Sequence, residues 1–191
     1  MDADFSIELG REDPVLDFPW TDPEGRLAYV DLKRHPEMLA SLGEVSQFPE
    51  LGEFLRAVNS AISIVESAKC DAWATDELSS DEEIFGASHK FASYVDLVFT
   101  GDDDRQSLAS HERSAKRLVE LLRRAPETAS SAEVCVRRAY YDCEREIVEG
   151  CYFTVYVNGF GDDQEKARKN WEIALRLVAN ALVQLSAARM A

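Results

Sequence analysis

Aromatic and polar side chains that could contact a ligand gather on two stretches of alternating sequence, about sixty residues apart. From Lys90 to Phe99, alternation places the apolar residues on one face of a strand and Tyr94 and Asp96 on the other. From Ile147 to Asn158, the same alternation turns Tyr152 and Tyr156 outward. Tyr140 or Tyr141, from the strand before, is expected to join them. The sequence therefore predicts a sheet face that is rich in tyrosine.

Such a face is too apolar to lie in water, and tyrosine suits interfaces because it joins a large ring to a polar tip. We expect it to be covered by the N-terminal arm or by a second copy of the protein, or to bind a ligand. If a ligand pocket lies between the two stretches, His89, Asp96, Tyr156 and Arg138 would supply its polar groups.

Other patterns that carry chemistry are weak in this sequence. The three histidines show no helical metal spacing and no H-E-x-x-H, and the four cysteines contain no C-x-x-C. Gly159-Phe-Gly161 lacks the third glycine of a dinucleotide-binding loop. We therefore predict no catalytic residue, no metal site and no cofactor, and the sequence leaves open whether the protein is an enzyme.

The motif Gly-Asp-Asp occurs twice, at Gly101 and at Gly161. Clustered carboxylates can bind Mg²⁺ or Ca²⁺, but aspartate is also strongly preferred where a helix begins. Each motif stands between a predicted strand and a predicted helix. We therefore expect Asp102 and Asp162 to be helix caps, with Glu165 completing a capping box.

The remaining elements follow from hydrophobic periodicity. Helices are predicted from Pro49 to about Ala68, from the first Gly-Asp-Asp to Pro126, and from the second to the C-terminal region. Strands are predicted in these ranges: Arg26–Leu32, Cys70–Thr75, Lys90–Phe99, Val134–Tyr141 and Ile147–Asn158. The order β-α-β-β-α-β-β-α predicts an α+β fold of ferredoxin-like character, in which helices pack on one face of an antiparallel sheet.

The chain divides into an arm and one domain. Residues 1–25 contain three prolines and eight acidic side chains against one basic side chain, and a short edge strand is expected at Phe5–Leu9. Residues 26–191 form a single domain of two repeats, about 48–124 and 125–191, that share one core.

Charge and hydropathy restrict the partners. The net charge is −15, which argues against binding to nucleic acid or to an anionic membrane, since both attract Lys and Arg. The sequence has no run of 18 apolar residues and begins with acidic residues, unlike a signal peptide. With the sparse cysteines, this predicts a cytoplasmic protein.

Three functions remain open at this stage. The first is a non-catalytic interaction protein that forms a homodimer through the tyrosine-rich face. The second is a small-molecule-binding protein or enzyme with a pocket between the repeats. The third is an acidic inhibitor, of the immunity type, for a basic protein partner.

Overall fold

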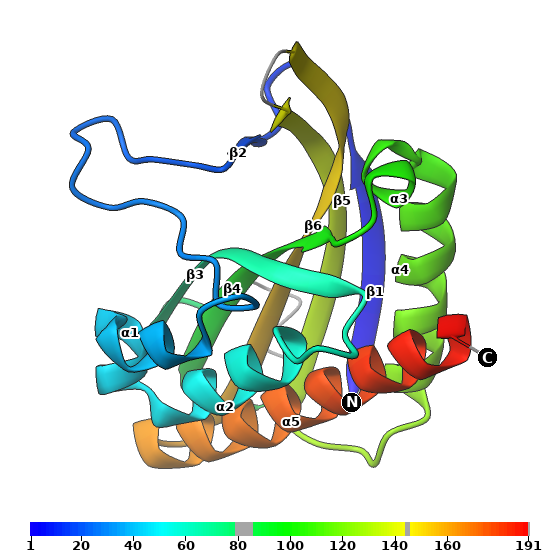
Figure 1. Ribbon diagram of the computed structural model, residues 1–191. Helices are drawn as coiled ribbons and strands as arrows, with labels where there is room; N and C mark the ends of the chain where they lie inside the picture. The colour runs from blue at the N-terminus through cyan, green and yellow to red at the C-terminus, as the bar shows by residue number, and fades with distance from the viewer. Residues whose placement is uncertain (79–85, 144–145, 191) are drawn as a thin grey trace.

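The computed structural model describes residues 1–78, 86–143 and 146–190 and has an α+β fold (Figure 1). Its strands are β1 (Asp2–Glu8), β2 (Val15–Phe18), β3 (Val65–Thr75), β4 (His89–Phe99), β5 (Ser130–Cys143) and β6 (Glu146–Gly161). Its helices are the 3₁₀ helix η1 (Pro36–Ser41), α1 (Gly43–Gln47), α2 (Pro49–Val58), α3 (Asp102–Gln106), α4 (Leu108–Arg123) and α5 (Gln164–Met190). Within the described residues, no helix is both long enough and apolar enough to cross a membrane.

The strands form one mixed sheet in the order β1-β5-β6-β4-β3, and β2 continues beyond β1 along β5. The hairpins β3–β4 and β5–β6 are antiparallel, and they meet where β4 pairs with β6. Both β1 and β2 run parallel to β5. The prediction of an antiparallel sheet was therefore wrong at this edge, because the N-terminal arm adds parallel strands whose partner lies far away in the sequence.

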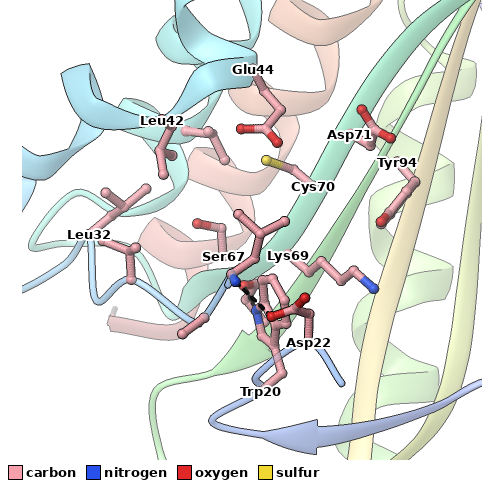
Figure 2. Close-up of a pocket in the computed structure, with 15 residues that line it drawn as sticks. Trp20, Asp22, Leu32, Leu42, Glu44, Ser67, Lys69, Cys70, Asp71 and Tyr94 are labelled. Atoms are coloured by element: carbon pink, nitrogen blue, oxygen red, sulfur yellow. Dashed lines mark hydrogen bonds between the residues drawn. The ribbon is translucent and has the colours of Figure 1, made fainter. Parts of the chain in front are cut away.

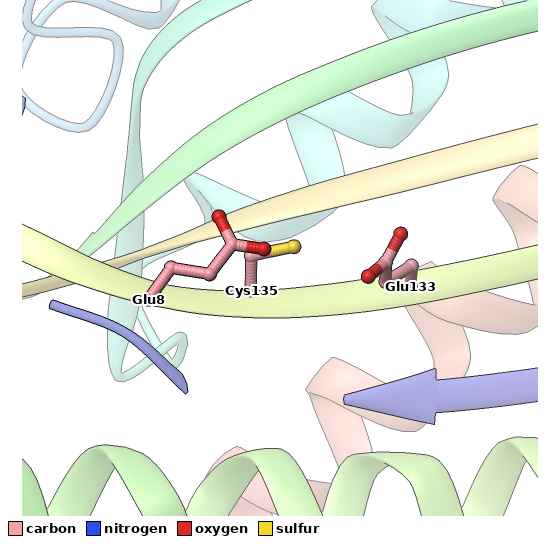
Figure 3. Close-up of side chains that lie close together, drawn as sticks. All are labelled: Glu8, Glu133 and Cys135. Carbon is pink, nitrogen blue, oxygen red and sulfur yellow. The ribbon is translucent and has the colours of Figure 1, made fainter. Parts of the chain in front are cut away.

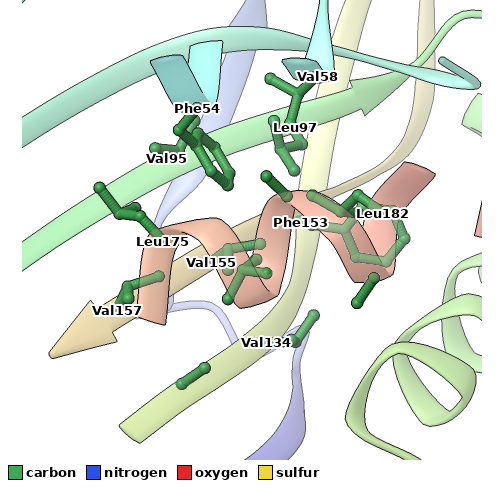
Figure 4. Close-up of a cluster of buried hydrophobic side chains, with 14 of the residues drawn as sticks. Phe54, Val58, Val95, Leu97, Val134, Phe153, Val155, Val157, Leu175 and Leu182 are labelled. Atoms are coloured by element: carbon green, nitrogen blue, oxygen red, sulfur yellow. The ribbon is translucent and has the colours of Figure 1, made fainter. Parts of the chain in front are cut away.

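The main hydrophobic core lies between the sheet and the helices α2, α4 and α5 (Figures 1 and 4). Val95, Phe153 and Val155 point into it from the strands, as alternation predicted. Trp171 of α5 is fully buried, packs on Phe91 with ring centroids 4.6 Å apart, and donates its indole N–H to Ser93 Oγ at 2.8 Å. The helices thus cover one face of the sheet, as expected.

Close approach of α5 to β6 depends on two glycines. A Cβ atom at Gly159 would overlap the backbone of Ala167 and Trp171, and one at Gly161 would overlap the backbone nitrogen of Ala167. Glycine lets the helix backbone approach the strand this closely. The Gly159-Phe-Gly161 segment therefore serves packing.

The first helix and the first strand differ from the prediction. The helix ends at Val58, because the Asn59 amide accepts from the Ser67 backbone N–H and donates to Leu55 O, reversing the chain. The hydrophobic periodicity that includes Ile62 predicted a longer helix, but Ile62 is 53% exposed and lies in the turn after the helix. Arg26–Leu32 is not a strand, since its one ladder contact is an isolated bridge from Ala28 to Thr21.

The residues that cap the helices differ from the predicted caps, Asp102 and Asp162. The α5 cap is Asp163, whose Oδ1 accepts from the Lys166 backbone N–H at 2.7 Å, while Asp162 pairs with the Lys166 ammonium at 2.9 Å. Asp102 lies in the first turn of α3 without a side-chain cap bond, and Ser107 caps the longer α4. Glu165 lies in the first turn of α5, where a negative charge interacts favourably with the helix dipole.

We predict that Gly159→Ala destabilises the protein by about 3 kcal/mol, because the added methyl group must push α5 away from β6. Chemical denaturation measures this loss. Gly43→Ala is the matched control, since no atom lies within 4 Å of a Cβ built there, and its stability should change by less than about 0.5 kcal/mol. Equal stability of the two variants would contradict the proposed packing role.

Candidate functional site

The face of the sheet opposite the helices, here called the open face, is partly covered by the chain itself. Residues 19–32, here called the crossing segment, leave β2 and pass over this face before η1 (Figure 1). Trp20 anchors the segment by donating its indole N–H to Ala68 O at 2.5 Å. A second hydrophobic cluster lies beneath, and its members are Leu16, Phe18, Ala68, Val98, Ala139, Tyr141 and Tyr152, with Trp20 and Tyr29 packed against them.

Two adjoining hollows lie beside this cluster. The first, the apolar hollow, has a volume of about 270 Å³ and reaches from the crossing segment to α1 and β3 (Figure 2). The second, the polar hollow, has a volume of about 400 Å³ and lies between residues 14–23 and strands β3 to β6. Trp20, Asp22, Lys69 and Tyr94 line both, so the two form one connected candidate site.

A buried hydrogen-bond network forms the floor of the polar hollow. Arg137 Nη1 donates to Thr154 Oγ1 and to Tyr156 OH, both at 3.0 Å, and Thr154 Oγ1 donates to Asp96 Oδ1 at 2.7 Å. On its other side, Arg137 contacts Glu8 Oε2 through Nε at 2.8 Å and Nη2 at 2.7 Å. The network connects β1, β5, β6 and β4 across the open face.

The pKa values of the two acidic groups in the network shift in opposite directions. Asp96 is 7% exposed, and desolvation raises its pKa from 3.8 to about 6 against the opposing effects of Thr154, Lys69 and Arg137. Burial would also raise the pKa of Glu8, but the bonds from Arg137 and Ser6 lower it overall. A carboxyl group that titrates near neutrality beside a hollow is a typical feature of functional sites.

Four of the residues predicted from the sequence meet at this site: Tyr94, Asp96, Tyr152 and Tyr156 all line the polar hollow. Sequence reasoning missed Arg137, Lys69 and Trp20. Alternation within β5 could have found Arg137, because residues 137, 139 and 141 share the face of Tyr141.

Three other predicted residues lie elsewhere. His89 begins β4, seven residues from Asp96 and roughly 23 Å away along the strand, and its Nε2 lies 3.6 Å from Asp76 Oδ1. Arg138 donates to Leu9 O and pairs with Glu149 at 3.4 Å. Tyr140 precedes Tyr141 in β5, so its side chain points to the opposite face.

One group among the described residues has ligand atoms close enough together to hold a metal ion: Glu8, Glu133 and Cys135, within 4.8 Å of one another (Figure 3). Two of its members, Glu8 and Cys135, are poorly suited to bind a metal ion. Glu8 is the ion-pair partner of Arg137, and burial raises the pKa of the Cys135 thiol to about 12. Metal ions bind the thiolate rather than the thiol, so the geometry alone does not make a metal centre.

No family model, no curated protein and no solved structure matches this chain.

We predict that Asp96→Asn stabilises the protein by about 1–3 kcal/mol at pH 8, since the amide can still accept from Thr154 without a buried charge. The folded-state pKa of Asp96 is raised, so its stabilising contribution is present below about pH 4 and is lost as the pH rises through about 6. The advantage of the variant should therefore grow across this window.

Denaturation curves from pH 4 to pH 8 measure this difference. Asp103→Asn, which removes a carboxylate exposed on α3, controls for the change in net charge. An Asp96→Asn variant that is destabilised equally at every pH would contradict the assigned environment.

Proposed function

We propose that this protein binds a small organic molecule between the crossing segment and the open face. The observation that carries the proposal is the pair of adjoining hollows, lined together by residues 14–32, by the sheet, and by Leu42, Glu44 and Leu55. Their volumes of about 270 and 400 Å³ suit small ligands, whose pockets are concave, largely apolar and supplied with a few fixed polar groups.

The polar network supports this proposal because burying charged groups on a sheet face costs free energy. Replacing buried ion pairs by apolar residues of similar size is often neutral or stabilising. Arg137 is 8% exposed and Thr154 is 1% exposed, while an apolar cluster occupies the neighbouring part of the same face. A ligand that contacts Asp96 and Tyr156 would give this costly arrangement a role.

Binding rather than catalysis is proposed because of the chemistry of the lining. The thiol of Cys70 faces the apolar hollow beside Glu44 (Figure 2). Burial, together with Glu44, Asp71 and Asp96, raises its pKa to about 12. A thiol that stays protonated is a poor nucleophile.

Thermal denaturation with a collection of small molecules of varied charge tests the proposal. We predict that a ligand at about a hundred times its Kd stabilises the wild type by about 2.7 kcal/mol. The substitution Ala28→Phe, at an exposed position on the rim of the apolar hollow, should abolish that shift by filling the hollow.

Ala187→Phe, on an exposed position of α5, is the matched control and should keep the full shift. If every stabilising molecule acts equally on the wild type and on Ala28→Phe, the hollow is not the binding site and the proposal fails.

The expected homodimer and the expected basic partner stay predictions. Tyr152 lies beneath the chain's own Leu16 and Phe18, so a second copy would have to contact the part of the face around Trp73, which is 39% exposed. Sedimentation velocity of the wild type beside Trp73→Asp would test that contact.

We also infer that the two hairpins derive from a duplicated unit, and ferredoxin-like character remains part of this proposal. Supporting it, β4 and β6 are equivalent second strands that lie side by side, and each is followed by Gly-Asp-Asp and a helix.

A further inference from the structure

The charges around the two hollows are strongly unequal. Five carboxylate side chains line them: Asp17, Asp22, Glu44, Asp71 and Asp96. The opposing basic side chains are Lys69 and Arg137, and Arg137 is already paired with Glu8. Lys69 is therefore the one basic lining residue whose charge is not offset by an ion pair among the described residues. A ligand that enters this site meets a negative electrostatic potential.

The raised pKa values of Tyr94 and Cys70 agree with a negative potential at the site. Burial raises the pKa of Tyr94, and the negative charges of Asp96 and Asp71 raise it further. The pKa of Cys70 is raised by burial and by Glu44, Asp71 and Asp96. Both groups resist becoming anions first because they are buried, and further because the surrounding carboxylates repel a negative charge.

Aromatic rings form the walls of the same space. Trp20 and Tyr94 line both hollows, and Tyr152 and Tyr156 line the polar one. The Tyr94 ring also packs near Tyr156 and Trp73, with centroids 6.3 and 6.4 Å apart. Carboxylates together with the faces of Trp and Tyr are the groups that recognise ammonium ligands.

The chain itself places an ammonium group at this position. Lys69 Nζ lies 5.3 Å from the centroid of the Trp20 ring, within the range of a cation–π contact. Lys69 stands opposite Asp96 in the β3–β4 register. Because the Lys69 side chain is exposed, it is free to move aside toward solvent. Its ammonium group is a stand-in, from within the protein, for the charged part of a ligand.

From these observations we propose that the site selects an organic cation, an amine or quaternary ammonium carried on an apolar or aromatic body. The inference rests on the proposed binding function and names its ligand class. The apolar body occupies the apolar hollow against Leu32, Leu42 and Leu55, and the cation lies between the Trp20 ring and the carboxylates of Asp22 and Asp96. The ligand cation and Lys69 compete for the same position.

Calorimetry at pH 8 with three probes that share an indole ring tests this proposal: tryptamine, a cation; tryptophol, which is neutral; and indole-3-acetate, an anion. Tryptamine should bind about tenfold more tightly than tryptophol, and indole-3-acetate more weakly than either. Asp96→Asn should weaken tryptamine about tenfold, while Asp103→Asn, outside the hollows, should leave its affinity unchanged.

Lys69→Gln gives the sharpest result, because removal of the competing ammonium should tighten tryptamine severalfold. Lys169→Gln, at an exposed position of α5, is the matched control and should have no effect. Tighter binding of indole-3-acetate, equal binding of the three probes, absence of tryptamine binding, or weaker tryptamine binding in Lys69→Gln would each overturn the assigned ligand class. If other molecules still stabilise the wild type and lose this effect in Ala28→Phe, the binding function stands and the cation inference alone fails.

Discussion

The pairing of Arg137 with Glu8 is the interaction on which the open face depends. A guanidinium that is 8% exposed would be strongly destabilising without a carboxylate, and the partner comes from β1, at the far end of the chain. The ion pair therefore joins the N-terminal strand to β5, and Arg137 continues the network to Thr154 of the central strand β6. Once β1 is fixed along β5, β2 follows it, and the crossing segment must pass over the face that Arg137 occupies.

The Arg137–Glu8 pair also orders the polar floor of the candidate site. One side of Arg137 is neutralised by Glu8, and the other orders Thr154 and Tyr156 below the polar hollow. Asp96, at the end of this network, keeps a carboxyl group with a pKa of about 6 beside a wall of aromatic rings. The arrangement combines a rigid floor, made of strands, with a wall that belongs to an irregular segment.

The local parts of this structure could be predicted from the sequence, because they depend on hydrophobic periodicity and on turn residues. The alternation around Val95 and Phe153 gave the buried and open faces of β4 and β6, and Tyr94, Asp96, Tyr152 and Tyr156 followed. The non-local parts could not. Nothing near Glu8 in the sequence indicates its pairing with a strand 129 residues away, and a shift of one residue separates Arg137 in the site from Arg138 outside it.

The parallel pairing of β1 also sets an order of assembly. Asp2 pairs with Ser131, and Glu8 pairs with Arg137, so β1 is synthesised well before its partner and can pair only once β5 has been made. Until then Glu8 lacks its guanidinium partner. The two antiparallel hairpins pair strands that are neighbours in the sequence, whereas the wall that residues 14–23 give the polar hollow depends on the distant pairing of β1 and β2 with β5.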